Sequence, residues 1–86
     1  MILVAMPTKP QHARRYARVP KFLCELRTGA GLTQRELAKK LQEPQSWVYK
    51  CENGIRRVDV AEFCDWSREC GMEPDQAIRR FLTSKR

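Results

Sequence analysis

Residues 33–54, TQRELAKKLQEPQSWVYKCENG, contain two short helical patterns that lie about three residues apart. The first pattern opens with a capping box, in which the Thr33 hydroxyl accepts a hydrogen bond from the Glu36 amide and the Glu36 carboxylate accepts one from the Thr33 amide. Pro44 ends this helix, because proline disfavours helical geometry in the preceding residue, and proline also suits the first turn of a new helix. Gly54 closes the second helix as a left-handed cap. Two helices joined so closely must cross at a steep angle, so the second one keeps an uncovered face.

The uncovered face of the second helix is polar and aromatic. At about 100° per residue, Val48 and Cys51 share the inner side of residues 44–53. The outer side carries one cation and no carboxylate, which suits a helix that enters a nucleic-acid groove. Its residues are Gln45, Ser46, Trp47, Tyr49 and Lys50.

Three more helical patterns surround this pair, and together they predict an all-α domain. Apolar residues recur on one face of the first pattern until Gly29 and Gly31 end it. Asp59 and Glu62 form an acidic capping box before the fourth helix, and Pro74 opens the fifth. The five expected helices span residues 20–29, 33–42, 44–53, 60–70 and 74–83.

The fourth and fifth expected helices carry more apolar side chains than a small core can cover. Trp66 lies off the expected inner stripe of the fourth helix, and Phe81 and Leu82 lie in a short helix near the chain end. We therefore expect a two-fold dimer contact at this place. The expected inner stripe is Val60, Phe63, Cys64, Ser67 and Cys70. The candidate dimer residues are Trp66, Ile78, Phe81 and Leu82.

The 86 residues are enough for one small domain, and their charge is unevenly distributed. Residues 1–57 contain twelve Lys and Arg against four Glu, a balance of +8, whereas residues 58–86 contain five against six, a balance of −1. A charge difference of this size between the two parts of the chain favours binding to nucleic acid or to an anionic membrane surface over an ordinary solvated basic surface. Residues 1–18 are basic and show no sustained periodicity. We expect a flexible or partly helical arm there, with its DNA contact left open, and the folded domain at residues 19–83.

The remaining features argue against export, metal binding and catalysis. The apolar opening MILVAM is broken by Pro7 and is too short for a secretory segment or a membrane span, so we expect a cytoplasmic protein. No cysteine pair has zinc-knuckle spacing, and the one histidine, His12, lies far from the cysteines. We expect four reduced thiols on apolar helix faces, no metal and no cofactor. The sequence also lacks a cysteine–histidine pairing, a glycine-rich phosphate loop and paired carboxylates, so we expect no enzyme.

The spacing of these patterns resembles the helix-turn-helix of the Xre/Cro phage-repressor family. The match runs from about Leu23 to Leu82 and rests on GLTQRELAKKL, PQSWVYKCENG and DVAEFCDWSRECGM in that order. It implies a compact five-helix, lambda-repressor-like DNA-binding domain, with Ala38 where the two helices cross. Gln42 departs from the family, which often has glycine at this turn. A positive φ at Gln42 would cost about 1 kcal/mol.

The resemblance also implies which residues contact double-stranded DNA. Independently of the family, the Gln45 amide suits adenine and the Lys50 ammonium suits guanine. Trp47 is as well explained by packing as by a DNA contact, and helix capping alone explains Thr33 and Gln34. The implied base-reading residues are Gln45, Ser46, Trp47 and Lys50. The implied phosphate contacts are Thr33, Gln34, Asn53, Arg56 and Arg57. Arg27 and Glu52 correspond to a buried ion pair.

Together these features predict a sequence-specific transcriptional regulator, a repressor or autoregulator. A homodimer would place two helices 44–53 about 34 Å apart, one turn of DNA, so that both read the major groove. An antitoxin or restriction-controller-type regulator with a protein partner such as a toxin is one alternative. A protein-interaction adaptor that does not read DNA is the other.

Overall fold

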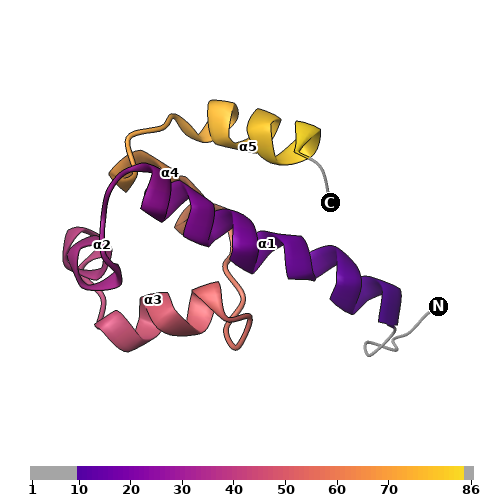
Figure 1. Cartoon of the computed structure of the whole chain (residues 1–86), viewed down its shortest axis with the longest axis horizontal. Coiled ribbons are helices and arrows are strands. Elements are labelled where there is room, and N and C mark those ends of the chain that lie inside the picture. Colours follow the sequence, from indigo (N-terminus) through magenta and orange to yellow (C-terminus); the bar gives the residue numbers. More distant parts are fainter. Residues whose placement is uncertain (1–9, 85–86) are drawn as a thin grey trace.

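Five helices and no strand make up residues 10–84, the part of the chain that the computed structural model describes. The expected all-α class with five helices is confirmed. Helix α1 crosses the middle of the molecule, with α3 on one side of it and α5 on the other (Figure 1). The helices are α1 (Pro10–Gly29), α2 (Gln34–Leu41), α3 (Gln45–Glu52), α4 (Val60–Glu69) and α5 (Pro74–Thr83).

Helix α1 begins at Pro10, ten residues before the start expected at residue 20. Residues 10–18, which were expected to belong to a flexible or partly helical arm, are therefore helical, and residues 1–9 of that arm lie outside the described residues. Pro20 led to the wrong boundary, because proline commonly opens a helix. Here Pro20 lies inside α1 and is buried.

The N-terminal half of α1 is held by contacts with distant segments, which compensate for a proline inside the helix. The Arg18 Nη2 atom donates to the carbonyl oxygen of Phe81 at 2.6 Å and to the hydroxyl of Ser84 at 3.0 Å. The guanidinium also lies 4.3 Å from the centre of the Phe81 ring. On another side, the Tyr16 hydroxyl accepts a hydrogen bond from the Val58 amide at 3.0 Å. Such long-range contacts cannot be read from local periodicity.

The core is formed by inward side chains from all five helices. Each fully buried aliphatic or aromatic side chain contributes about 1.5 to 3 kcal/mol through removal of its apolar surface from water. Ala38 is only 3% exposed, as expected for a small residue at the crossing of α2 and α3. The core residues are Phe22, Leu23, Leu26, Leu37, Ala38, Val48, Cys51, Trp66 and Ala77.

Trp66 is fully buried in this core, so its expected place in a dimer contact is wrong. Its indole Nε1–H donates to the carbonyl oxygen of Leu23 at 3.1 Å, which satisfies the polar atom of a buried tryptophan. Ser67 is buried as expected, but the inner face of α4 is rotated relative to the expected stripe, because Trp66 is buried whereas Val60 is 80% exposed.

The apolar residues of α5 divide between the core and the surface. Phe81 is half-buried, and its ring packs edge-on against Phe22 with the ring centres 5.3 Å apart. Ile78 and Leu82 are 45% and 70% exposed. These two side chains are therefore the uncovered members of the expected dimer set.

The turns around α2 and α3 follow the expected local chemistry. The Thr33 hydroxyl accepts from the Glu36 amide at 3.0 Å, and the Glu36 carboxylate accepts from the Thr33 amide at 2.9 Å. Gln42 has a φ of 59°, and Gly54 has a φ of 73°. Glycine occupies such left-handed geometry readily, whereas glutamine does so at a cost. The α2–α3 turn is therefore locally strained at Gln42.

The four cysteines are free, and none of them is fully exposed. Burial raises the pKa of the Cys51 thiol and raises that of Cys70 to about 11. Burial, followed by the nearby Glu52 carboxylate, also raises the pKa of Cys24. Within residues 10–84, no group of three or more His, Cys, Asp and Glu side chains is placed to hold a metal ion. None of the described helices has the length and apolarity needed to span a membrane.

Candidate nucleic-acid interface

Helix α3 is buried on one face and open on the other. Val48 and Cys51 are fully buried, and the Glu52 side chain is only 4% exposed. The carboxylate at the end of the helix is therefore turned away from solvent. The outer face keeps a single cation, Lys50. The exposed residues on and beside this face are Gln45, Ser46, Tyr49, Lys50 and Asn53.

Arg27 and Glu52, the two members of the expected ion pair, lie in direct contact. The Arg27 Nε atom is 2.6 Å from Glu52 Oε2, and Arg27 Nη2 is 3.0 Å from Glu52 Oε1. The Glu52 carboxylate thereby raises the pKa of Arg27. A third Arg27 nitrogen donates to the Leu32 carbonyl oxygen at 2.8 Å, and the Gln34 amide donates to Glu52 at 3.0 Å. This network ties α3 to α1 and to the start of α2, which fixes the direction in which the outer face points.

An open groove of about 550 Å³ lies where α2 and α3 begin. The N-terminal end of a helix attracts anions, because its first amides are unpaired and its dipole is positive there. Thr33 and Gln34 lie in this groove, although the Thr33 hydroxyl already caps α2 and the Gln34 side chain already contacts Glu52. Arg35 is exposed beside them, a cation that was not among the residues expected to contact DNA.

Trp47 and Arg56 are engaged in contacts within the protein. The Trp47 ring is half-buried, with its centre 6.0 Å from that of Trp66 and 5.0 Å from the Arg56 guanidinium. Arg56 also donates to both carboxylate oxygens of Glu62 at 3.0 Å. These two hydrogen bonds, with a third from the Asp59 amide, lower the pKa of Glu62. Packing thus accounts for Trp47, and Arg56 has an internal partner where a phosphate contact was expected.

Arg57 and Asn53 remain at the surface near the end of α3. The Arg57 guanidinium lies 4.1 Å from the centre of the Tyr16 ring. Tyr16 was missed because it lies in the segment interpreted as an arm. Its spacing from Val19 and Leu23, three and seven residues later, was the available signal that the first helix begins earlier.

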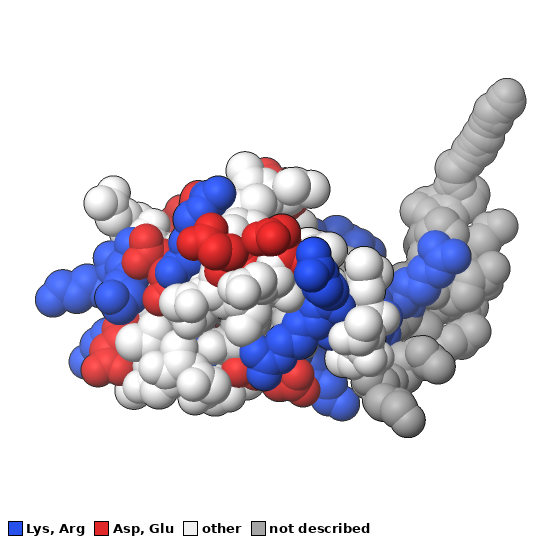
Figure 2. Space-filling view, turned by 90° about the horizontal axis from the view of Figure 1, so that it is seen from above, with Lys and Arg blue, Asp and Glu red and all other residues white. Residues whose placement is uncertain are grey.

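The far side of the molecule has a different distribution of charge. Figure 2 views the protein from above, the side on which α5 lies in Figure 1, and shows acidic and basic side chains interspersed. The exposed face of α3 has no carboxylate. A polyanion is therefore better accommodated at α3 than on the α5 side.

Comparison with known proteins places helices α2 and α3 within the match to one protein family. The model of a family described as a helix-turn-helix domain matches residues 21–81. A solved structure, titled "XRE-family like protein from Pseudomonas syringae pv. tomato str. DC3000", is 43% identical in sequence with a TM-score of 0.77. The match covers 90% of this chain and 96% of that one. No curated protein matches the chain.

Proposed function

The chain belongs to the Xre-type helix-turn-helix family of DNA-binding regulators, and we propose that it represses transcription by reading one DNA sequence with helix α3. The observation that carries this proposal is the outer face of α3, which is exposed, has one cation and has no carboxylate. A helix of this width fits the major groove of B-form DNA, where the four base pairs present distinct donors and acceptors.

Three exposed side chains of α3 have the chemistry to read bases. The Gln45 amide can pair with the N6 and N7 atoms of adenine, and the Lys50 ammonium can donate to the O6 and N7 atoms of guanine. The Ser46 hydroxyl can donate or accept. Each well-formed contact discriminates by about 1 to 3 kcal/mol against the wrong base. Trp47 contributes by holding the helix in place.

Phosphate contacts at the two ends of α3 would supply affinity without sequence information. Near the beginning of α3, where α2 also begins, the backbone amide of Gln34 and the exposed cation of Arg35 are available, whereas the Thr33 amide already donates to Glu36. At the end, Asn53 and Arg57 are available. Because these contacts release counterions from the duplex, affinity should fall steeply as salt rises.

A homodimer would recognise two DNA half-sites related by two-fold symmetry. Ile78 and Leu82 on α5 are exposed apolar side chains, and the half-buried Phe81 lies on the same helix. Pairing of two α5 helices would cover these side chains and present two α3 helices to half-sites about 34 Å apart. Occupancy of such a site over a promoter would exclude other proteins from it.

Selection of bound duplexes from a random DNA pool tests the proposal. We expect enrichment of a two-fold symmetric sequence, with half-sites one helical turn apart. The selected duplex should bind much more tightly than a scrambled one at the same salt concentration. Binding without enrichment, equally sensitive to salt on both duplexes, would refute sequence-specific repression and would favour a protein-interaction role.

A further inference from the structure

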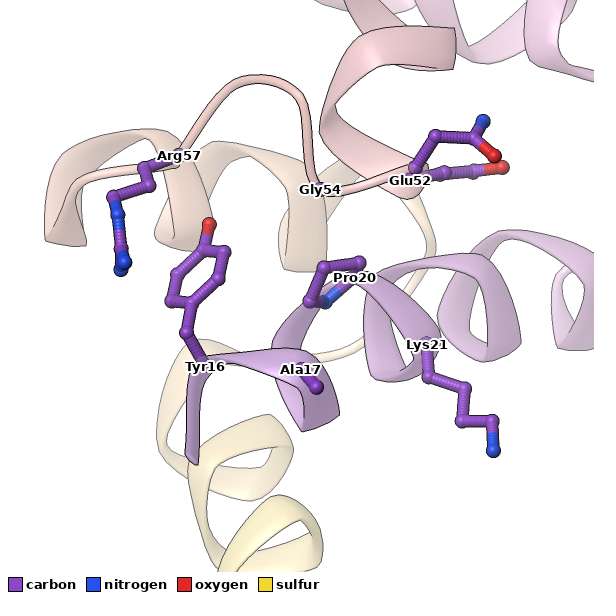
Figure 3. Close-up of a pocket in the computed structure, with 8 residues that line it drawn as sticks. Tyr16, Ala17, Pro20, Lys21, Glu52, Gly54 and Arg57 are labelled. Carbon is purple, nitrogen blue, oxygen red and sulfur yellow. The ribbon is translucent and has the colours of Figure 1, made fainter. Parts of the chain in front are cut away.

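A second groove, of about 650 Å³, lies between the N-terminal half of α1 and the turn that follows α3 (Figure 3). It opens beside Asn53, four residues after Tyr49 on the exposed side of α3. The groove is therefore continuous with the C-terminal end of the candidate DNA surface. Its lining includes Tyr16, Pro20, Lys21, Asn53, Gly54 and Arg57.

Tyr16 holds two successive residues of the turn. Its hydroxyl accepts a hydrogen bond from the Val58 amide at 3.0 Å, and its ring lies 4.1 Å from the Arg57 guanidinium. Figure 3 shows the Arg57 side chain beside the Tyr16 ring. Gly54, with a φ of 73°, turns the chain back toward α1. One tyrosine thus fixes both the backbone and the cation of this turn.

The groove carries a positive charge that is available to a ligand. Lys21 and Arg57 are exposed, whereas the one carboxylate in the lining, Glu52, is bound by Arg27. A guanidinium that lies against an aromatic face keeps its in-plane N–H groups free to donate. The guanidinium of Arg56, in contrast to that of Arg57, already donates hydrogen bonds to Glu62.

We propose that Tyr16 is a positioning residue, which holds Arg57 so that its guanidinium binds a backbone phosphate of DNA at the end of α3. Lys21 supplies a second cation from the α1 side of the same groove. Immobilising Arg57 in advance lowers the side-chain entropy that binding must otherwise remove. This inference rests on the proposed function only in taking DNA as the polyanion.

A double-mutant cycle between Tyr16 and Arg57 tests the proposal. Binding is measured at several salt concentrations, with every variant first checked by circular dichroism to be folded. Tyr16→Leu should weaken binding about 3- to 10-fold in the wild-type background, the effect of mobilising one long side chain. In the Arg57→Gln background it should have no further effect, because the cation that Tyr16 positions is then absent.

Salt dependence and a conservative variant separate positioning from stability. Arg57→Gln and Lys21→Gln should each lower the slope of log affinity against log salt by about 0.9. Tyr16→Phe should bind DNA about as tightly as wild type, because it keeps the ring under the guanidinium. It loses the Val58 hydrogen bond, so its melting temperature should be lower. Arg79→Gln, which removes an exposed cation from α5, is the matched control and should leave the slope nearly unchanged.

Two results would overturn the proposal. One is equal weakening by Tyr16→Leu with and without Arg57. The other is a Tyr16→Phe variant that binds as weakly as Tyr16→Leu. Because phosphate contacts are formed on any duplex, the cycle can be measured on scrambled DNA. If the cycle shows coupling between Tyr16 and Arg57 but selection enriches no DNA sequence, only the proposal of sequence-specific repression is contradicted. If selection enriches a sequence but the cycle shows no coupling, only the positioning role of Tyr16 is contradicted.

Discussion

The two faces of helix α3 are built from opposite kinds of chemistry. The inner face carries fully buried Val48 and Cys51, with the Glu52 carboxylate bound to Arg27, whereas the outer face carries exposed Gln45 and Lys50. Stability is therefore concentrated on one side and recognition on the other. Stability and DNA recognition should therefore respond to different substitutions.

The largest expected effect is at Arg27. Arg27→Ala would leave the Glu52 carboxylate buried, with the Gln34 amide as its one remaining partner among residues 10–84. We expect a loss of roughly 3 to 5 kcal/mol in the free energy of unfolding, measured by urea denaturation at low temperature. The double variant Arg27→Met, Glu52→Leu should recover most of this loss, because it leaves no buried charge. A loss of only a few tenths for Arg27→Ala would mean that the pair does not brace α3.

A matched pair of substitutions compares the two faces directly. Val48→Ala on the inner face should cost about 2 kcal/mol, from lost apolar burial and the cavity left behind. Ser46→Ala on the outer face should change stability by less than about 0.5 kcal/mol. Equal losses in thermal denaturation would contradict the division between faces.

The turn that joins α2 to α3 offers a smaller, stabilising change. Gln42→Gly places glycine at a φ of 59° and should stabilise the fold by about 1 kcal/mol. Because Gln42 lies outside the proposed base contacts, the selected DNA sequence should stay the same. An unchanged or lower melting temperature would show that no strain is stored at this turn.

The smallest expected effect concerns the half-buried pair of Arg56 and Glu62. Arg56 lowers the pKa of Glu62, so the contribution of this carboxylate is complete above its ordinary value of 4.5 and is lost as pH falls through the lowered value. The Glu62→Gln variant should be slightly less stable than wild type at neutral pH, and the difference should shrink in acid. Urea midpoints at several pH values would reveal it. A difference that grows in acid would have the wrong sign.

The sequence predicted the tight helix pair better than it predicted the packing around it. The Thr33 capping box, Pro44 and Gly54 act through neighbouring residues, so local chemistry suffices to find α2 and α3. Pro20 misplaced the start of α1, because what holds the preceding residues is a contact of Tyr16 with Val58, 42 positions away.

The distant partners of side chains were also missed. Trp66 was assigned to the surface because periodicity does not reveal the Leu23 carbonyl that makes its burial possible. The phosphate contact of Arg56 stays a prediction, but its ion pair with Glu62 was not foreseen, because Glu62 had been assigned only to the capping of α4. The candidate base readers were easier to find, since an exposed helix face follows from the helical period alone.

The ratio of affinities for the selected and the scrambled duplex, measured for Lys50→Ala, is the most direct test of base reading by the outer face of α3. We expect this ratio to fall by the equivalent of about 1 to 3 kcal/mol while the melting temperature stays nearly unchanged. Arg57→Gln, the matched control, should weaken both duplexes alike. An unchanged ratio for Lys50→Ala, with equal losses on both duplexes, would contradict base reading by the outer face of α3.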